Sequence, residues 1–186
     1  MTSPVTERLL EYLWPKGDLP TTPQVYALID GARDSSFEWR IRLSRLEYSC
    51  LYAGRLSPAL LRAAPYLVHL TPKSQFTQEL LGSAWGTSWG ILTIVPPDCT
   101  IQQQRRHFRT LLRVRTEAGK ILAFRFYDPR VLRIYVPTCT PAELTQFFGP
   151  IPTLAAESKD ARELLVYSRA VAGLTHRSVP LVPALT

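Results

Sequence analysis

Residues 25–31 have the sequence VYALIDG, and this segment decides the fold class. The apolar run Val25–Ile29 ends at Asp30 and Gly31, which is the pattern of a buried strand followed by a turn. Short apolar runs of the same kind recur at 48–52, 66–70 and 89–95, and segments with helical periodicity separate them. We therefore expect an α+β protein with a single mixed sheet of short strands and interspersed helices.

Capping signals locate the helices. An amphipathic helix is expected at 3–13, and two more at 36–46 and 71–81. Hydroxyl and carboxylate residues begin the others: Thr100 before 101–111, Asp128 before Pro129, and the pair Thr140 and Glu143, which has the spacing of a capping box. That last helix is expected to bury Leu144, Phe147 and Phe148.

A hairpin is predicted between 112–116 and 121–127, with Gly119 near its tip and Glu117 in its turn. Alternation at its end would hide Phe124 and Phe126 on one face and send Arg125 to the other.

We expect three regions along the chain: an N-terminal helix and linker at 1–23, the main domain at 24–151, and a short C-terminal appendage and tail at 152–186. The appendage is predicted to be helical over 161–172, although 164–167 also fits a strand. A loose tail is expected over 178–186.

The charge is concentrated in one stretch. Between Arg105 and Arg133 there are nine basic and two acidic side chains, so this stretch accounts for the whole net charge of +7. The rest of the chain is neutral. A basic face on a neutral body indicates an acidic partner surface or nucleic acid.

The composition favours a globular cytoplasmic protein. No run reaches the roughly 18 apolar residues that cross a bilayer, and the N-terminus lacks the order of charges and apolar residues of a secretory signal. The three cysteines, Cys50, Cys99 and Cys139, are odd in number and far apart, so we expect buried, reduced thiols.

No constellation of residues indicates catalysis, a metal or a cofactor. The histidines are isolated, and the Trp85–Gly90 segment fits packing under a sheet better than an aromatic platform for a sugar or base. The group Arg125, Tyr127 and Asp128 fits a salt-bridged helix cap better than an active site. A hydrolase that uses Asp128 or Cys139 stays open as an alternative.

Several segments, taken in order, resemble the type VI secretion effector adaptor family, the Tap or Tec adaptor-chaperones, which were long known only as a domain of unknown function. The resemblance covers about 25–151. The segments are YALIDGA (26–32), LYAG (51–54), APYLV (64–68), SWGI (88–91), FRFYDPRV (124–131), PTCTPAEL (137–144) and FFGP (147–150). The residues in them that we single out as structural motif positions are Asp30, Trp89, Arg125, Tyr127, Asp128, Thr140 and Glu143.

The resemblance implies a non-catalytic role without a cofactor. Members of this family bind a toxic effector, often near its N-terminal region, and help to mount it on the VgrG spike protein before secretion, and they remain in the cytoplasm. From charge and expected exposure we add the hypothesis that five arginines engage an acidic partner surface: Arg105, Arg106, Arg109, Arg130 and Arg133. The rival hypothesis is nucleic-acid binding by the basic face 105–133, although no recognisable nucleic-acid module supports it.

Overall fold

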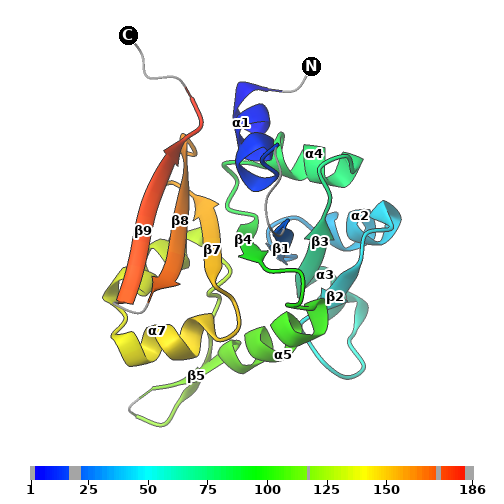
Figure 1. Cartoon of the computed structure of the whole chain (residues 1–186). Helices are drawn as coiled ribbons and strands as arrows, with labels where there is room; N and C mark the ends of the chain where they lie inside the picture. The colour runs from blue at the N-terminus through cyan, green and yellow to red at the C-terminus, as the bar shows by residue number, and fades with distance from the viewer. Residues whose placement is uncertain (1–2, 17–21, 117, 171–172, 183–186) are drawn as a thin grey trace.

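The computed structural model describes residues 3–16, 22–116, 118–170 and 173–182, and it confirms the α+β class (Figure 1). Seven strands form the main sheet in the order β2-β3-β1-β4-β7-β8-β9. Every pairing in this sheet is antiparallel, so it is not the mixed sheet that we expected.

The elements have the following bounds. The main sheet comprises β1 (Gln24–Asp30), β2 (Tyr48–Cys50), β3 (Pro65–Leu70), β4 (Gly90–Val95), β7 (Thr153–Glu157), β8 (Glu163–Ala170) and β9 (Gly173–Pro180). A second, two-stranded sheet contains β5 (Arg113–Arg115) and β6 (Ile121–Ala123). The helices are α1 (Pro4–Leu13), α2 (Phe37–Ser44), α3 (Pro58–Ala63), α4 (Gln75–Leu81), α5 (Ile101–Leu111), α6 (Pro129–Tyr135) and α7 (Pro141–Phe148), and the 3-10 turn η1 (Val136–Thr138) follows α6.

Strand β1 lies inside the sheet, between β3 and β4, and separates two cores. Val25, Ala27 and Ile29 belong to the core on one face, and Tyr26 and Leu28 belong to the core on the other. Because side chains alternate along a strand, a continuous apolar run is what a strand needs when both of its faces are buried.

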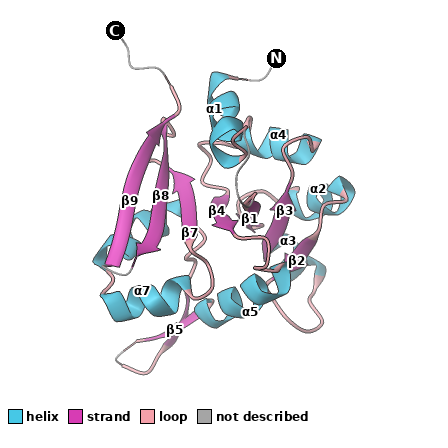
Figure 2. Cartoon of the chain, viewed as in Figure 1, coloured by secondary structure: helices cyan, strands magenta, loops and turns pink. Residues whose placement is uncertain are grey.

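Helices cover both faces of the sheet (Figure 2). The first core packs β1 against α1, α2 and α4, through residues such as Leu9, Ile41 and Leu80. The second core packs it against α5, α6 and α7, through residues such as Phe108 and Phe147. The fold therefore has three layers, with helices above and below one twisted sheet.

The expected helix at 161–172 is wrong, and the alternative of a strand at 164–167 is confirmed, while 171–172 lie outside the described residues. Residues 163–170 form β8, which pairs with β7 and β9. Leu164 and Val166 face the first core, whereas Leu165 and Tyr167 face the second, so the segment follows the period of a strand and not that of a helix.

The C-terminal strands continue the main sheet, because β7 pairs with β4 through Leu92 and Ala155. A loose tail was expected over 178–186, but β9 continues through Pro180. Residues 183–186 lie outside the described residues.

The hairpin prediction is confirmed, but in a shorter form and as a separate sheet. Strands β5 and β6 pair through Val114 and Leu122, and the chain leaves the strand after Ala123. Phe126 is then buried in a turn, while Phe124 is half-buried. Glu117, in the hairpin turn, lies outside the described residues, as do 17–21 of the predicted linker.

Candidate partner-binding surface

Helix α5 presents two of the predicted arginines to solvent. Its first turn is held by a full capping box between Thr100 and Gln103, so the predicted N-cap is confirmed. Arg106 and Arg109 are exposed on the helix. Arg105 is only half-exposed, because its Nε donates a hydrogen bond of 3.0 Å to the carbonyl oxygen of Cys50. Arg105 therefore joins α5 to the end of β2.

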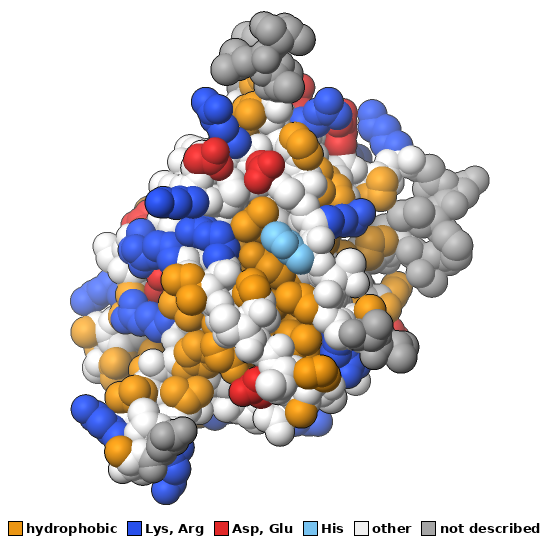
Figure 3. All heavy atoms as spheres, turned by 90° about the vertical axis from the view of Figure 1, so that its left-hand side faces the viewer, with side chains coloured by type: hydrophobic (Ala, Val, Ile, Leu, Met, Phe, Trp, Pro, Cys, Tyr) orange, Lys and Arg blue, Asp and Glu red, His pale blue; other side chains and the backbone are white. Residues whose placement is uncertain are grey.

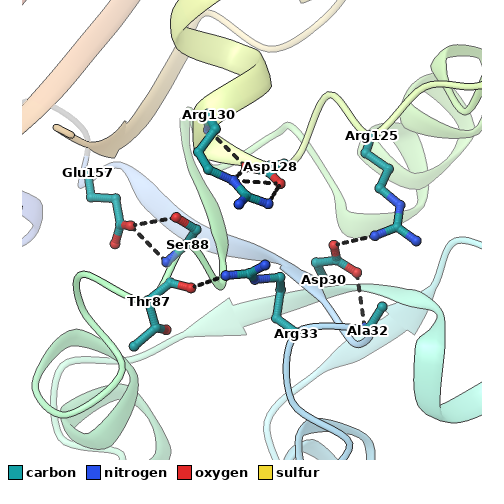
Figure 4. Close-up of polar contacts among 9 residues, drawn as sticks. All are labelled: Asp30, Ala32, Arg33, Thr87, Ser88, Arg125, Asp128, Arg130 and Glu157. Atoms are coloured by element: carbon teal, nitrogen blue, oxygen red, sulfur yellow. Dashed lines mark hydrogen bonds and ion pairs between the residues drawn. The ribbon is translucent and has the colours of Figure 1, made fainter.

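Helix α6 begins as predicted at Asp128, whose carboxylate accepts a hydrogen bond from the backbone N–H of Arg130 at 2.9 Å. The Arg130 guanidinium returns to the same carboxylate, with its second terminal nitrogen 2.6 Å from Oδ2 (Figure 4). One turn later, Arg133 donates to the carbonyl oxygen of Glu157 at 2.8 Å. Both arginines thus have partners within the protein.

The Asp128 carboxylate is nearly buried, and two effects on its pKa oppose each other. Burial raises the pKa of Asp128. The hydrogen bonds from Arg130 and the charge of its guanidinium lower this pKa, and together they outweigh burial, so the net shift is downward. Asp128 is therefore held as a carboxylate. This is the salt-bridged helix cap that the sequence indicated.

Asp30 ends β1 with a fully buried carboxylate. Its Oδ1 accepts a hydrogen bond from the Ala32 N–H at 3.0 Å, while its Oδ2 has no hydrogen-bond partner and lies 3.5 Å from a terminal nitrogen of Arg125. Burial raises the pKa of Asp30, and the bond from Ala32 and the charge of Arg125 only partly offset it. Arg125 thus pairs with Asp30, so the segment after β6 is tied to the end of β1 (Figure 4).

The side chains of Tyr127 and Trp89 are both buried. Burial raises the pKa of the Tyr127 hydroxyl, and the negative charge of Asp30 adds to the shift. The Trp89 ring belongs to the first core, and Trp85 packs against that core while its indole nitrogen donates to the Ala161 carbonyl oxygen at 3.0 Å. These rings are packed, as expected, and do not form a platform.

Glu157, which sequence reasoning missed, organises the loop before β4. One oxygen of its buried carboxylate accepts from the Gly86 N–H at 2.7 Å, and the other accepts from the Ser88 N–H at 2.8 Å (the latter is drawn in Figure 4). Both donors belong to a tight turn in which Gly86 and Ser88 have positive φ. An isolated glutamate at the end of a short apolar strand carries no signal of this role in the sequence.

The capping box at Thr140 and Glu143 is confirmed at the start of α7, and Leu144, Phe147 and Phe148 of that helix are buried. This helix covers the second core beside β8 and β9. The predicted cap positions are therefore structural.

Cys139 and His107 each donate a hydrogen bond to a backbone carbonyl oxygen. Burial raises the pKa of Cys139, whose Sγ donates to the Tyr135 carbonyl oxygen at 3.4 Å. Burial lowers the pKa of His107, whose Nε2 donates to the Phe147 carbonyl oxygen at 2.8 Å. A raised thiol pKa is the opposite of what an activated nucleophile requires. Within the described ranges, no group of three potential ligands could hold a metal ion.

A groove with a volume of about 700 Å³ lies between α5, the β5–β6 hairpin and the segment that leads into α3. We call it the α5 groove. The apolar side chains that line it are Leu51, Leu56, Leu60, Leu112, Ile121 and Leu122. Arg109 and Arg113 line it as well, together with Tyr52 and two alanines. No single stretch of sequence predicts this surface, because three separate segments build it.

Basic side chains gather around this part of the molecule. Arg109 and Arg113 are exposed where they line the groove, and Figure 3, in which the β9 side of the molecule faces the viewer, shows further Lys and Arg side chains on the projecting hairpin at the lower left. Ile121 is 57% exposed and Leu60 is 50% exposed, so the groove shows large apolar side chains to solvent beside these charges.

A family model described as "Domain of unknown function (DUF4123)" matches residues 25–146. The chain belongs to the DUF4123 family. No curated protein and no solved structure matches it. In the described parts of the chain, no helix is long and apolar enough to span a membrane.

The residues matched to DUF4123 include the whole α5 groove, the Asp30–Arg125 pair and the Asp128 cap. They exclude β7, β8 and β9, which complete the sheet from outside the matched region. Of the five arginines predicted to contact a partner, Arg106 and Arg109 are exposed on α5, whereas the other three form hydrogen bonds within the fold.

Proposed function

We propose that this DUF4123 protein is a non-catalytic cytoplasmic adaptor that binds a type VI secretion effector and promotes its loading onto the VgrG spike. Family membership and the ordered segments that resemble the adaptor family support the proposal. The structural observation that carries it is the α5 groove, an exposed apolar surface beside basic side chains within the matched region.

An exposed apolar surface of this kind is typical of a protein-binding site. Burial of leucine and isoleucine side chains supplies affinity, while the surrounding charges steer the partner and contribute specificity. Arg106 and Arg109 are suited to the second role, because their guanidinium groups are exposed.

Nucleic-acid binding by the basic face is the competing function. Proteins that bind single strands stack bases on aromatic side chains. Tyr52 is the one aromatic residue among those that line the α5 groove, and the rest of the lining is mostly aliphatic. The groove therefore fits a protein partner better than a nucleic acid.

Co-purification tests the proposal. The full chain is expressed together with the products of the two neighbouring genes, and complexes are analysed by size-exclusion chromatography and mass spectrometry. We expect a stoichiometric complex with the effector and a ternary complex that includes VgrG. A chain that elutes alone, or with nucleic acid that high salt removes, would contradict the adaptor function.

Charge reversal provides the second test. The double variant Arg106→Glu and Arg109→Glu is expected to weaken the effector complex and to reduce its salt dependence. Lys73→Glu together with Lys159→Glu, at two exposed positions that do not line the α5 groove, is the charge-matched control. Arg105 is left unchanged here because its substitution also breaks the contact with Cys50.

A further inference from the structure

The α5 groove has two walls of independent origin. One wall comes from the loop after β2 and from α3, and it contributes Leu56 and Leu60. The other comes from the end of α5 and the hairpin, and it contributes Leu112, Ile121 and Leu122. Its floor includes Leu51, which is fully buried and belongs to the second core. The floor of the groove is therefore part of the second core, while its walls face solvent.

In the residues that the structure describes, the two segments that build the walls carry charges of the same sign. Over 51–63 the charged residues are Arg55 and Arg62, and both are exposed. Over 109–123 the charged residues that the structure describes are Arg109, Arg113, Arg115 and Lys120, all of them exposed. Of these residues, Arg109 and Arg113 line the groove itself. An apolar channel that is lined by arginines and bordered by positively charged segments is complementary to a segment with an apolar ridge and flanking carboxylates.

The geometry favours a helix over an extended strand as the occupant. Strand addition needs a long free edge, because it gains affinity from a ladder of main-chain hydrogen bonds. The strands that border the groove, β5 and β6, have only three residues each. Binding must then depend on side chains in an apolar channel, which is how amphipathic helices dock, with anchors at positions i, i+3 or i+4, and i+7.

We propose that the α5 groove binds an acidic amphipathic helix of the effector, with its apolar ridge on Leu60, Ile121 and Leu122 and its carboxylates against the arginines that line the groove, Arg109 and Arg113. This inference rests on the proposed adaptor function, since it assigns the effector to one surface of the chain. It also specifies the chemistry of the segment that the chain recognises.

The test uses the full chain and the purified effector in isothermal titration calorimetry. Leu60→Asp and Ile121→Asp place a charge in the apolar channel, and each is expected to weaken binding about 30-fold. The matched control is Leu43→Asp on α2, a residue that is 70% exposed and does not line the groove. Circular dichroism melting curves of the three variants establish that they fold.

A second pair of variants tests the charged walls. Arg109→Glu together with Arg113→Glu is expected to slow association about tenfold in about 50 mM NaCl, and much less in about 300 mM NaCl, because salt screens exposed charges. The double variant Lys73→Glu and Lys159→Glu is again the charge-matched control. Stopped-flow fluorescence measures the rates.

The outcomes separate this inference from the adaptor function. If the effector binds all variants as tightly as it binds the unmodified chain, the groove assignment is wrong and the adaptor function stands. If the effector does not bind the unmodified chain, the adaptor function fails, and a random 16-residue peptide display library then tests the groove directly. Selected peptides should be acidic and amphipathic and should lose binding to Ile121→Asp; peptides without these properties would overturn the inference. Tight binding of a fluorescent single-stranded DNA oligonucleotide that Ile121→Asp abolishes would also overturn it.

Discussion

Removing the Asp128 carboxylate tests how much the cap of α6 contributes to the unfolding free energy. In Asp128→Ala, α6 loses the N-cap hydrogen bond from the Arg130 N–H, which contributes about 1 kcal/mol. The variant also loses the ion pair with the Arg130 guanidinium. Because that guanidinium is more than half exposed, solvent screens the pair, and we assign it at most about 1 kcal/mol. The expected loss of unfolding free energy is about 2 kcal/mol, which lowers Tm by about 4–8 °C in a chain of this size.

Urea unfolding at pH 7 measures this loss, and Asp128→Asn is the control. Asparagine retains a capping oxygen but not the charge, so it should lose only about 0.5–1 kcal/mol. The folded-state pKa of Asp128 is lowered, so its contribution is present above the unfolded pKa of about 3.9 and is lost as the pH falls through the folded value. The difference between the unmodified chain and Asp128→Ala should therefore shrink below about pH 4. A loss under about 0.5 kcal/mol at pH 7, or equal losses for the two variants, would refute the reasoning.

Three further substitutions have defined outcomes. Glu157→Ala leaves two backbone donors near Ser88 without their carboxylate, and it should lower the unfolding free energy by about 3 kcal/mol in urea unfolding. Asp30→Asn should gain stability relative to the unmodified chain as the pH rises from 4 to 7. The folded-state pKa of Asp30 is raised, so its contribution to stability is present at low pH and is lost as the pH rises. Urea unfolding at both pH values measures the difference in unfolding free energy between the two proteins. Gly90→Ala would place Cβ in a clash with the Leu28 carbonyl oxygen, so β1 and β4 must separate, and thermal melting should show a loss of at least about 3 kcal/mol in the unfolding free energy.

Each of these predictions has a contrary result. A Glu157→Ala variant as stable as the unmodified chain would mean that water satisfies the two donors. A stability difference for Asp30→Asn that does not change with pH would show that the buried carboxylate does not titrate differently in the folded state. An undisturbed Gly90→Ala variant would contradict the close approach of β1 and β4.

The local features of the site follow from the sequence. Thr100, Asp128 and Thr140 each precede a helix, and each accepts a hydrogen bond from that helix within three residues. The interactions are short in sequence, so residue type and spacing are sufficient to predict them. The burial of Phe147 follows in the same way from helical periodicity.

The availability of the arginines does not follow from the sequence. A run of basic residues predicts a positive surface, yet Arg105 donates to Cys50, 55 residues away, and Arg133 donates to Glu157, 24 residues away. Arg125 likewise pairs with Asp30 from a distant segment. Such contacts depend on how the layers pack, which residue spacing does not encode.

The sequence by itself determined the fold class, the buried strand at 25–29, the helix caps and the concentration of positive charge, because each depends on neighbouring residues or on composition. Only the tertiary structure decided that 163–170 is a strand, since an apolar run buried on both sides satisfies either periodicity until its partners β7 and β9 are known. Only the tertiary structure also built the α5 groove, which brings Leu60 and Ile121 onto one surface. Its shape comes from packing between segments that are far apart in the chain, and that packing is the physical reason why sequence patterns alone did not reveal it.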